Sequence, residues 1–212
     1  MSKKFLAALA AVLVLAAGSI AVAGCGDGGD ETTASSEQTD GAFIAAMIPH
    51  HESAIEMAKV AQKEAEHPQI KQLADDIIAA QDDEIGQMEQ MHQRMFGQPV
   101  QGADHGSLGL DDEMMGMTMD MHSLQGAKPF DRAFIDAMIP HHQGAIRMAQ
   151  VELAEGQDQE TKDLAQSIIS AQSKEIDEMN RWRQQWYGAP SPAGGVPSAD
   201  DMDMPSHDMM GH

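Results

Sequence analysis

Two copies of one pentapeptide constrain the fold of this 212-residue chain more than any other feature. Met47-Ile48-Pro49-His50-His51 returns 91 residues later as Met138-Ile139-Pro140-His141-His142. The same offset aligns residues 40–99 with residues 131–190 without a gap, and nearly half of the aligned positions are identical. The chain is therefore predicted to be an internal duplication in which each repeat forms one structural unit.

Each pentapeptide lies on the apolar face of a predicted helix. At about 100° per residue, His50 and His51 fall on the same broad face as Met47 and Met57, and the second copy repeats the pattern. Polar rings on an apolar face need partners there. Since the two rings diverge by about 100°, one could bind a metal ion while the other bonds a polar group such as Gln81.

The first helix of each repeat has a predicted start and a predicted irregularity. Asp40 and Asp131 precede the first apolar positions and are predicted N-caps. Pro49 and Pro140 then fall well inside the helical pattern. Each predicts a kink, because proline removes a backbone hydrogen bond, or alternatively the first turn of a new helix.

A second helix follows in each repeat and is predicted to end at Gly97 or Gly188, with a proline two residues later. The short turn between the two helices makes them antiparallel neighbours. One hairpin cannot bury its apolar face alone, so the duplication supplies the other half of a core. The predicted fold is all-α, a four-helix bundle made of two helical hairpins at 40–99 and 129–190.

The N-terminal region is predicted to be a secretion signal. Two lysines precede an apolar run that is too short to span a bilayer comfortably, and small residues then lead to Cys25, the only cysteine. Residues 1–24 resemble a bacterial lipoprotein signal, which would make Cys25 the lipidated first residue of a protein anchored on the extracytoplasmic side of the membrane. Ordinary cleavage nearby is the alternative. Residues 25–39 are predicted to be a flexible tether.

The charge of the chain restricts its partners. The formal net charge is −21 at pH 7. An acidic surface disfavours nucleic acid and anionic membrane surfaces and favours cations, although a merely solvated surface explains it as well.

Two further segments, residues 100–128 and 191–212, combine methionine and histidine with Gly, Asp and Ser and lack helical periodicity. Packing does not readily explain so many methionines in polar segments, because an exposed methionine gains little and is easily oxidised. Thioether sulfur prefers Cu(I), and imidazole extends the range to Cu(II), Zn and Ni. The predicted metal ligands of these segments are Met114, Met115, Met117, Met119, Met121, His122, Met202, Met204, His207, Met209, Met210 and His212.

The repeated block resembles domain-of-unknown-function family 305. The resemblance rests on Met-Ile-Pro-His-His followed by Ala-Ile, Met-Ala, Ile-Ile, Ala-Gln and Glu-Ile, in both repeats. It implies a ferritin-like helical fold and handling of copper, preferably Cu(I), outside the cytoplasm. It also implies a set of candidate ligands in the bundle: Met47, His50, His51, Met57, Met88, Met138, His141, His142, Met148 and Met179.

These patterns leave three functions open. The first is an anchored copper-binding protein that buffers, delivers or confers resistance to the metal, with an unknown donor or acceptor protein. The second is a di-iron oxidase, which the four-helix fold also permits. That site needs a Glu-x-x-His pair on each of two helices, and repeat two lacks them. The third is a structural lipoprotein whose histidines only satisfy one another.

Overall fold

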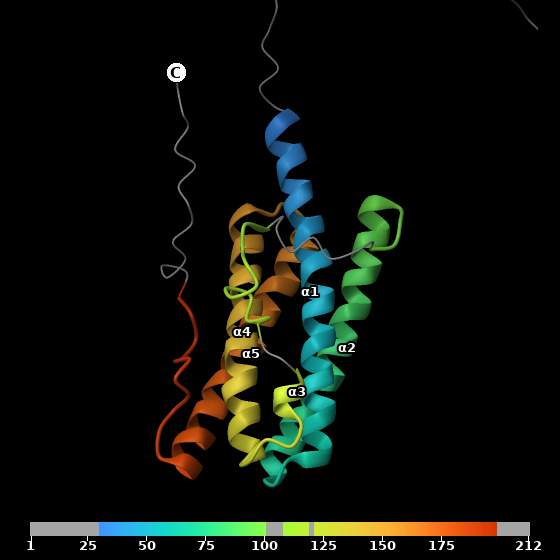
Figure 1. Ribbon diagram of the computed structural model, residues 1–212. Coiled ribbons are helices and arrows are strands. Elements are labelled where there is room, and N and C mark those ends of the chain that lie inside the picture. Colours follow the sequence, from blue (N-terminus) through green and yellow to red (C-terminus); the bar gives the residue numbers. More distant parts are fainter. Residues whose placement is uncertain (1–29, 101–107, 119–120, 199–212) are drawn as a thin grey trace, which may run out of the picture.

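The computed structural model describes residues 30–100, 108–118 and 121–198 (Figure 1). These residues form four long helices and one short one: α1 (Asp30–Glu64), α2 (Pro68–Phe96), α3 (Met121–Leu124), α4 (Phe130–Glu155) and α5 (Gln159–Tyr187). No strand occurs in the described part of the chain, and none of its helices is long and apolar enough to cross a membrane. The predicted all-α bundle of two hairpins is confirmed.

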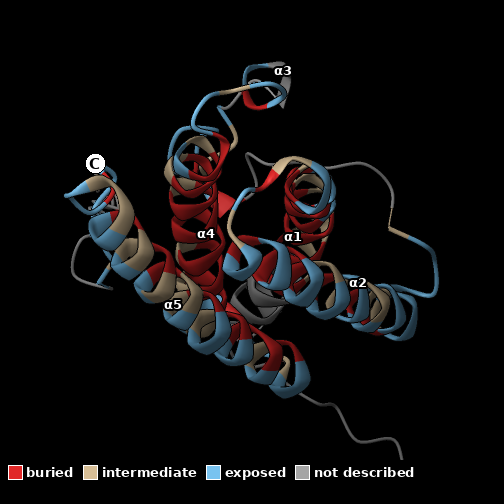
Figure 2. Cartoon of the chain, turned by 90° about the horizontal axis from the view of Figure 1, so that it is seen from below, coloured by how far each residue is buried: buried red, intermediate tan, exposed pale blue. Residues whose placement is uncertain are grey.

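The first helix of each repeat, α1 or α4, lies at the centre of the bundle. α1 packs against α2, α4 packs against α5, and α1 also contacts α4, whereas α2 and α5 touch each other little. α1 and α4 run in opposite directions (Figure 1). Figure 2 shows buried residues around most of α4, while α2 and α5 bury one stripe and expose the rest. The residues on the central helices are therefore the most deeply enclosed in the molecule.

The starts of the central helices differ from the prediction. α1 begins at Asp30, so the backbone of residues 30–39, which were predicted to belong to a flexible tether, is helical. α4 begins at Phe130, with Pro129 as its N-cap. Asp40 and Asp131 therefore lie inside helices, and the prediction that they are N-caps is wrong. An aspartate just before an apolar stripe suggested a local role, whereas the structure gives both residues partners that are distant in sequence.

Both prolines of the pentapeptides lie inside continuous helices. α1 passes through Pro49 and α4 passes through Pro140. The alternative in which each proline opens a new helix is therefore wrong. The ends of the outer helices follow the prediction, because Gly97 and Gly188 adopt left-handed conformations with φ of 67° and 84°.

The aspartates of each repeat hold the helix-to-helix turn of the other repeat. Asp131 accepts hydrogen bonds from the backbone N–H groups of Glu66 and His67, at 2.9 and 2.8 Å. Asp40 accepts in the same way from Gln157 at 3.0 Å and from the residue after it. These contacts are related by the 91-residue offset, so each hairpin stabilises the end of its counterpart. Both aspartates are almost completely buried.

A second carboxyl group lies at only one of these two ends. Glu152 is buried beside Asp40, and its repeat-one counterpart is Ala61. Gly156 leaves room for this pair, because a Cβ atom there would overlap the Glu152 carboxyl and lie 2.7 Å from Asp40 Oδ1. Burial raises the pKa of Glu152 to about 9, and the hydrogen bond to the Asp40 side chain adds to the increase.

The described linker and the segment after α5 both pack on the bundle, which their polar composition did not predict. Leu108, Leu110, Met115 and Leu124 are buried in the core. Packing therefore explains Met115, contrary to the expectation that linker methionines gain little from it.

We expect the cross-repeat hydrogen bonds to stabilise the bundle. Asp131→Ala and Asp40→Ala each leave two backbone N–H groups without their carboxylate and should lower the free energy of unfolding by about 1–3 kcal/mol. Urea denaturation followed by circular dichroism measures this. Asp82→Ala, at an exposed position of α2, is the control and should change stability by less than about 0.5 kcal/mol. Equal effects at Asp131 and Asp82 would contradict the assignment.

We also expect Glu152 to make stability pH-dependent. The folded protein keeps the Glu152 proton up to about pH 9, whereas a glutamate in the unfolded chain, whose ordinary pKa is 4.5, releases it. The unfolded state thus binds fewer protons between these values, and this residue's contribution to stability falls as the pH rises through that window. Glu152→Gln cannot ionise. Its melting temperature relative to the native protein should rise from pH 5 to pH 9, and a constant difference would show that Glu152 does not titrate in this way.

Candidate metal centre

A row of four imidazole rings crosses the middle of the bundle where α1 contacts α4. The rings of His50 and His141 lie face to face, with centroids 3.8 Å apart and planes inclined by 37°. His51 lies 6.4 Å from His50, and His142 lies 6.4 Å from His141. All four are buried. The duplication therefore brings the two histidine pairs together at the centre of one core, which the linear sequence did not show.

The outer ring of each pair bonds a carboxylate of the neighbouring helix. His51 Nε2 lies 2.8 Å from Glu84 Oε2, and His142 Nε2 lies 2.6 Å from Glu175 Oε2. One ring of each pair was expected to bond a polar group such as Gln81, and the polar group that reaches His51 is Glu84, one turn further along α2. The signal for it was present, since Glu84 and Glu175 are related by the same 91-residue offset. Such a carboxylate fixes ring orientation and increases the basicity of a metal-binding imidazole.

Several ring nitrogens of the row face the core without a hydrogen-bond partner. They are Nδ1 of His51, Nδ1 of His142 and both nitrogens of His141. Burial lowers the pKa of His141 well below 6.5, and the neighbouring histidines, His50 first, lower it further. His141 is therefore neutral at physiological pH. A neutral imidazole has a lone pair for a metal ion and releases no proton when it binds one.

The six predicted methionine ligands of the bundle fall into two buried groups. Each group contains two methionines of one repeat and one methionine of the other. Met57 of repeat one lies in the same core cluster as Met138 and Met179 of repeat two. The other cluster contains the offset-related set of Met47, Met88 and Met148. Each group therefore forms only when the two hairpins pack together.

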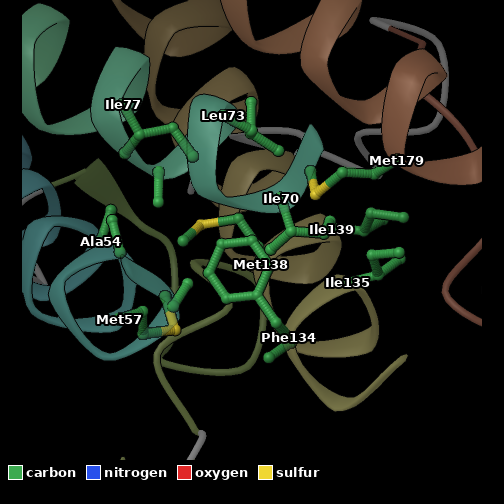
Figure 3. Close-up of a cluster of buried hydrophobic side chains, with 14 of the residues drawn as sticks. Ala54, Met57, Ile70, Leu73, Ile77, Phe134, Ile135, Met138, Ile139 and Met179 are labelled. Carbon is green, nitrogen blue, oxygen red and sulfur yellow. The ribbon is translucent and has the colours of Figure 1, made fainter. Parts of the chain in front are cut away.

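Within the first group, the sulfur atoms are surrounded by carbon. Figure 3 shows Ile70 and Phe134 among the side chains of Met57, Met138 and Met179. Both tryptophans of the chain, at positions 182 and 186, also pack against this cluster and not against the other. These methionines fill the core in this structure, and the indoles are placed to report any change in it.

The linker packs against the histidine row at His50. The carbonyl oxygen of Met115 lies 2.9 Å from His50 Nε2, which places a ring N–H donor there. The linker backbone comes so close to α4 that a Cβ atom at Gly144 would overlap the Met115 carbonyl. The equivalent position of repeat one is Ser53. The linker can approach α4 this closely because residue 144 is a glycine. The serine at the equivalent position of α1 would not permit the same approach, so the described linker comes this close to the histidine row on the α4 side only.

Two predicted ligands of the linker lie outside this row. Met114 is exposed and Met117 is partly buried near the second cluster. Met121 and His122 are the first two residues of α3. The remaining predictions lie outside the described residues: Cys25, Met119, Met202, Met204, His207, Met209, Met210 and His212.

Apart from the single carboxylate on each outer ring, the histidine row gathers no acidic ligands in the described part of the chain. No three or more His, Cys, Asp or Glu side chains come together there in a group that could hold a metal ion. What the geometry offers is pairs of imidazoles with thioethers one helical turn away, as Met47 is from His50 and Met138 is from His141. This is a soft donor set.

The fold and the site together define a class of protein. Its members are all-α bundles of two helical hairpins with a duplicated His-His pair where the central helices cross. The sequence model of the family described as domain of unknown function DUF305 matches residues 40–183 and 154–212. The chain belongs to this family, as its pentapeptides predicted.

Solved structures show the same fold. CopM in its Cu(I)-bound form is 42% identical, with a TM-score of 0.61, and the match covers 70% of this chain and 98% of that one. A putative secreted DUF305 protein from Streptomyces coelicolor is 25% identical, with a TM-score of 0.65, over 74% of this chain and 98% of that one. A DUF305 fragment from Deinococcus radiodurans is 28% identical, with a TM-score of 0.60, over 69% and 96%.

A curated relative matches a shorter stretch. The uncharacterized protein L153 of Acanthamoeba polyphaga mimivirus is 47% identical over 49 residues, which is 23% of this chain. The match spans about a third, 32%, of the length of that relative.

Proposed function

We propose that this protein binds copper outside the cytoplasm, and that it holds Cu(I) in the bundle through imidazole and thioether groups. The observation that carries the proposal is the buried row of four histidines at the α1–α4 crossing. Its outer rings are fixed by Glu84 and Glu175 and point a bare Nδ1 into the core. A carboxylate on one ring nitrogen and an open lone pair on the other is the usual arrangement of a metal-ligating histidine.

The chemistry of the neighbouring groups favours a soft monovalent ion. Thioether sulfur, without a charge or a proton, stabilises Cu(I) better than it stabilises harder divalent ions. Met47 and Met138 lie three residues before the central histidines and on the same helical face. A ligand set completed by sulfur would thus distinguish Cu(I) from zinc or iron, which prefer additional imidazoles or carboxylates.

The similar proteins support the same conclusion. CopM has been solved with Cu(I), with Cu(II) and with Ag bound, and the forms with Cu(I) and Cu(II) are 42% and 40% identical to this chain. Silver and Cu(I) share the preference for soft ligands. The neighbours found are copper-binding and DUF305 proteins rather than known enzymes, which favours a binding role over a di-iron oxidase.

The location and the additional ligands belong to the proposal as well. A lipidated Cys25 would anchor the protein on the extracytoplasmic side of the membrane. The methionines and histidines of the linker and of residues 199–212 would provide a second, outer set of Cu(I) ligands. Such an arrangement suits a protein that buffers copper or passes it to a partner.

The histidine row is tested by double variants in which residues 199–212 are deleted. Changing His51 and His142 to Leu should weaken Cu(I) binding by more than about 100-fold, because two ligands are lost. Changing Glu84 and Glu175 to Gln should weaken it by about 10–100-fold, because the ligands remain but lose their orienting carboxylates. Anaerobic competition with a chromogenic Cu(I) chelator measures both. His92→Leu, at a partly buried position of α2, is the control.

Circular dichroism of each apo variant has to show native helicity, because the core is expected to form without metal. If the two double variants and the His92 control all retain native affinity, the row does not bind copper.

The methionine groups can be tested separately, because both tryptophans report on one of them. Ag(I) binding near Met57, Met138 and Met179 should change tryptophan fluorescence. Met57→Leu should abolish that change, since it replaces a soft ligand by a carbon of similar volume. Met148→Leu is the matched control, because it makes the same replacement in the other cluster. If Met57→Leu keeps the native response as fully as Met148→Leu does, Met57 serves only as core packing.

A further inference from the structure

The groove between α4 and α5 is filled by the chain itself. After α5 the chain turns back along this hairpin (Figure 1). The Gln143 side-chain amide donates to the carbonyl oxygens of Ala193 and Gly195, at 2.9 and 2.7 Å. The Asn180 amide donates to the carbonyl of Gly194 at 2.7 Å. Gln143 is 6% exposed, so the segment covers it almost completely.

In the equivalent groove of repeat one the chain is described only as far as Val100, which lines the groove, and residues 101–107 lie outside the described part. A cavity of about 570 Å³ lies between α1 and α2. Its lining is Ala45, Ile48, Pro49, Glu52, Glu89, Gln93, Pro99 and Val100. The 91-residue offset maps these positions onto the groove of repeat two, where Glu52 corresponds to Gln143 and Glu89 corresponds to Asn180. The duplication has therefore produced two grooves of the same origin, and the described chain fills one of them.

The two grooves differ in the groups that bind a peptide backbone. In repeat two, side-chain amides donate hydrogen bonds to carbonyl oxygens. In repeat one, the same positions carry Glu52 and Glu89, whose carboxylates can only accept. A segment like residues 191–197 would turn its carbonyls toward negative charge there. The groove instead favours an occupant that brings N–H donors and a positive charge, and the net charge of −21 acts in the same direction.

We propose that the groove between α1 and α2 is a docking site for an extended segment of a partner protein that carries a lysine or arginine. The apolar floor at Ile48 and Pro49 accommodates small residues, as the second groove does, and the two carboxylates receive the cationic side chain. The site lies on the turn of α1 that precedes His50, so a partner docked there would contact the helix of the histidine row. The docking does not depend on copper binding.

Two synthetic heptapeptides test the proposal with the full-length mature protein. The first has the sequence of residues 191–197. The second has the same sequence with lysine at the position of Gly195. Each is titrated into ¹⁵N-labelled protein while the amide signals of Ile48, Glu52 and Val100 are followed. The lysine peptide should bind about tenfold more tightly than the neutral one, and added salt should reduce the difference.

An exchange of groove residues gives the decisive comparison. Glu52→Gln combined with Glu89→Asn installs the amides of repeat two, so the preference for the lysine peptide should fall to the small remainder that the net charge of the protein alone produces. Asp82→Asn combined with Glu155→Gln removes the same charge at exposed positions that do not line the cavity and should leave the preference unchanged.

The proposal is wrong if the native protein does not distinguish the peptides, or if the control loses the preference as fully as the groove variant. It is also wrong if neither peptide shifts these amides. A peptide that binds only after residues 101–107 are replaced by Gly and Ser would show that the linker, and not a partner, occupies the groove.

Discussion

The contact between His50 and His141 is the constraint on which the rest of the bundle depends. Two polar rings stacked at 3.8 Å in the middle of an apolar core are costly unless their nitrogens find partners. Glu84 and Glu175 bond the outer rings of the row, and the Met115 carbonyl bonds the inner ring of His50. The nitrogens of His141 remain without partners in the interior. Unpaired polar groups at the centre of a core are costly in free energy, and for this reason the proposed copper site is placed there.

The duplication makes this arrangement possible because the two hairpins complete each other. Asp131 and Asp40 each hold the turn of the opposite repeat, and each methionine group takes one member from the opposite repeat. Neither half therefore has a finished end, a finished core or a finished histidine row by itself. The symmetry is not exact, because more than half of the aligned positions differ. Glu152 in place of Ala61 and Gly144 in place of Ser53 allow one half to bury an acid and to receive the linker.

The same divergence separates the outer grooves. Amides at Gln143 and Asn180 hold the segment after α5, whereas carboxylates at Glu52 and Glu89 present an acidic surface between α1 and α2. In the proposed docking, one copy of this surface binds the protein's own chain and the other copy binds a partner. Four of the eight lining positions differ between the repeats, and at two of them a hydrogen-bond donor of repeat two is replaced by an acceptor in repeat one.

The sequence by itself determined the helices, the two hairpins, the family and the histidine pairs. Periodicity and the 91-residue offset are local or repeated signals, and they survive without knowledge of the packing. Only the tertiary structure decided what each polar group contacts. Asp40 and Asp131 were predicted to cap their own helices, but they accept hydrogen bonds from the turns of the opposite repeat. His51 bonds the carboxylate of Glu84 rather than the amide of Gln81. Such pairings depend on how two helices are rotated and shifted against each other, which is a property of the whole packed core and not of any single stretch of sequence.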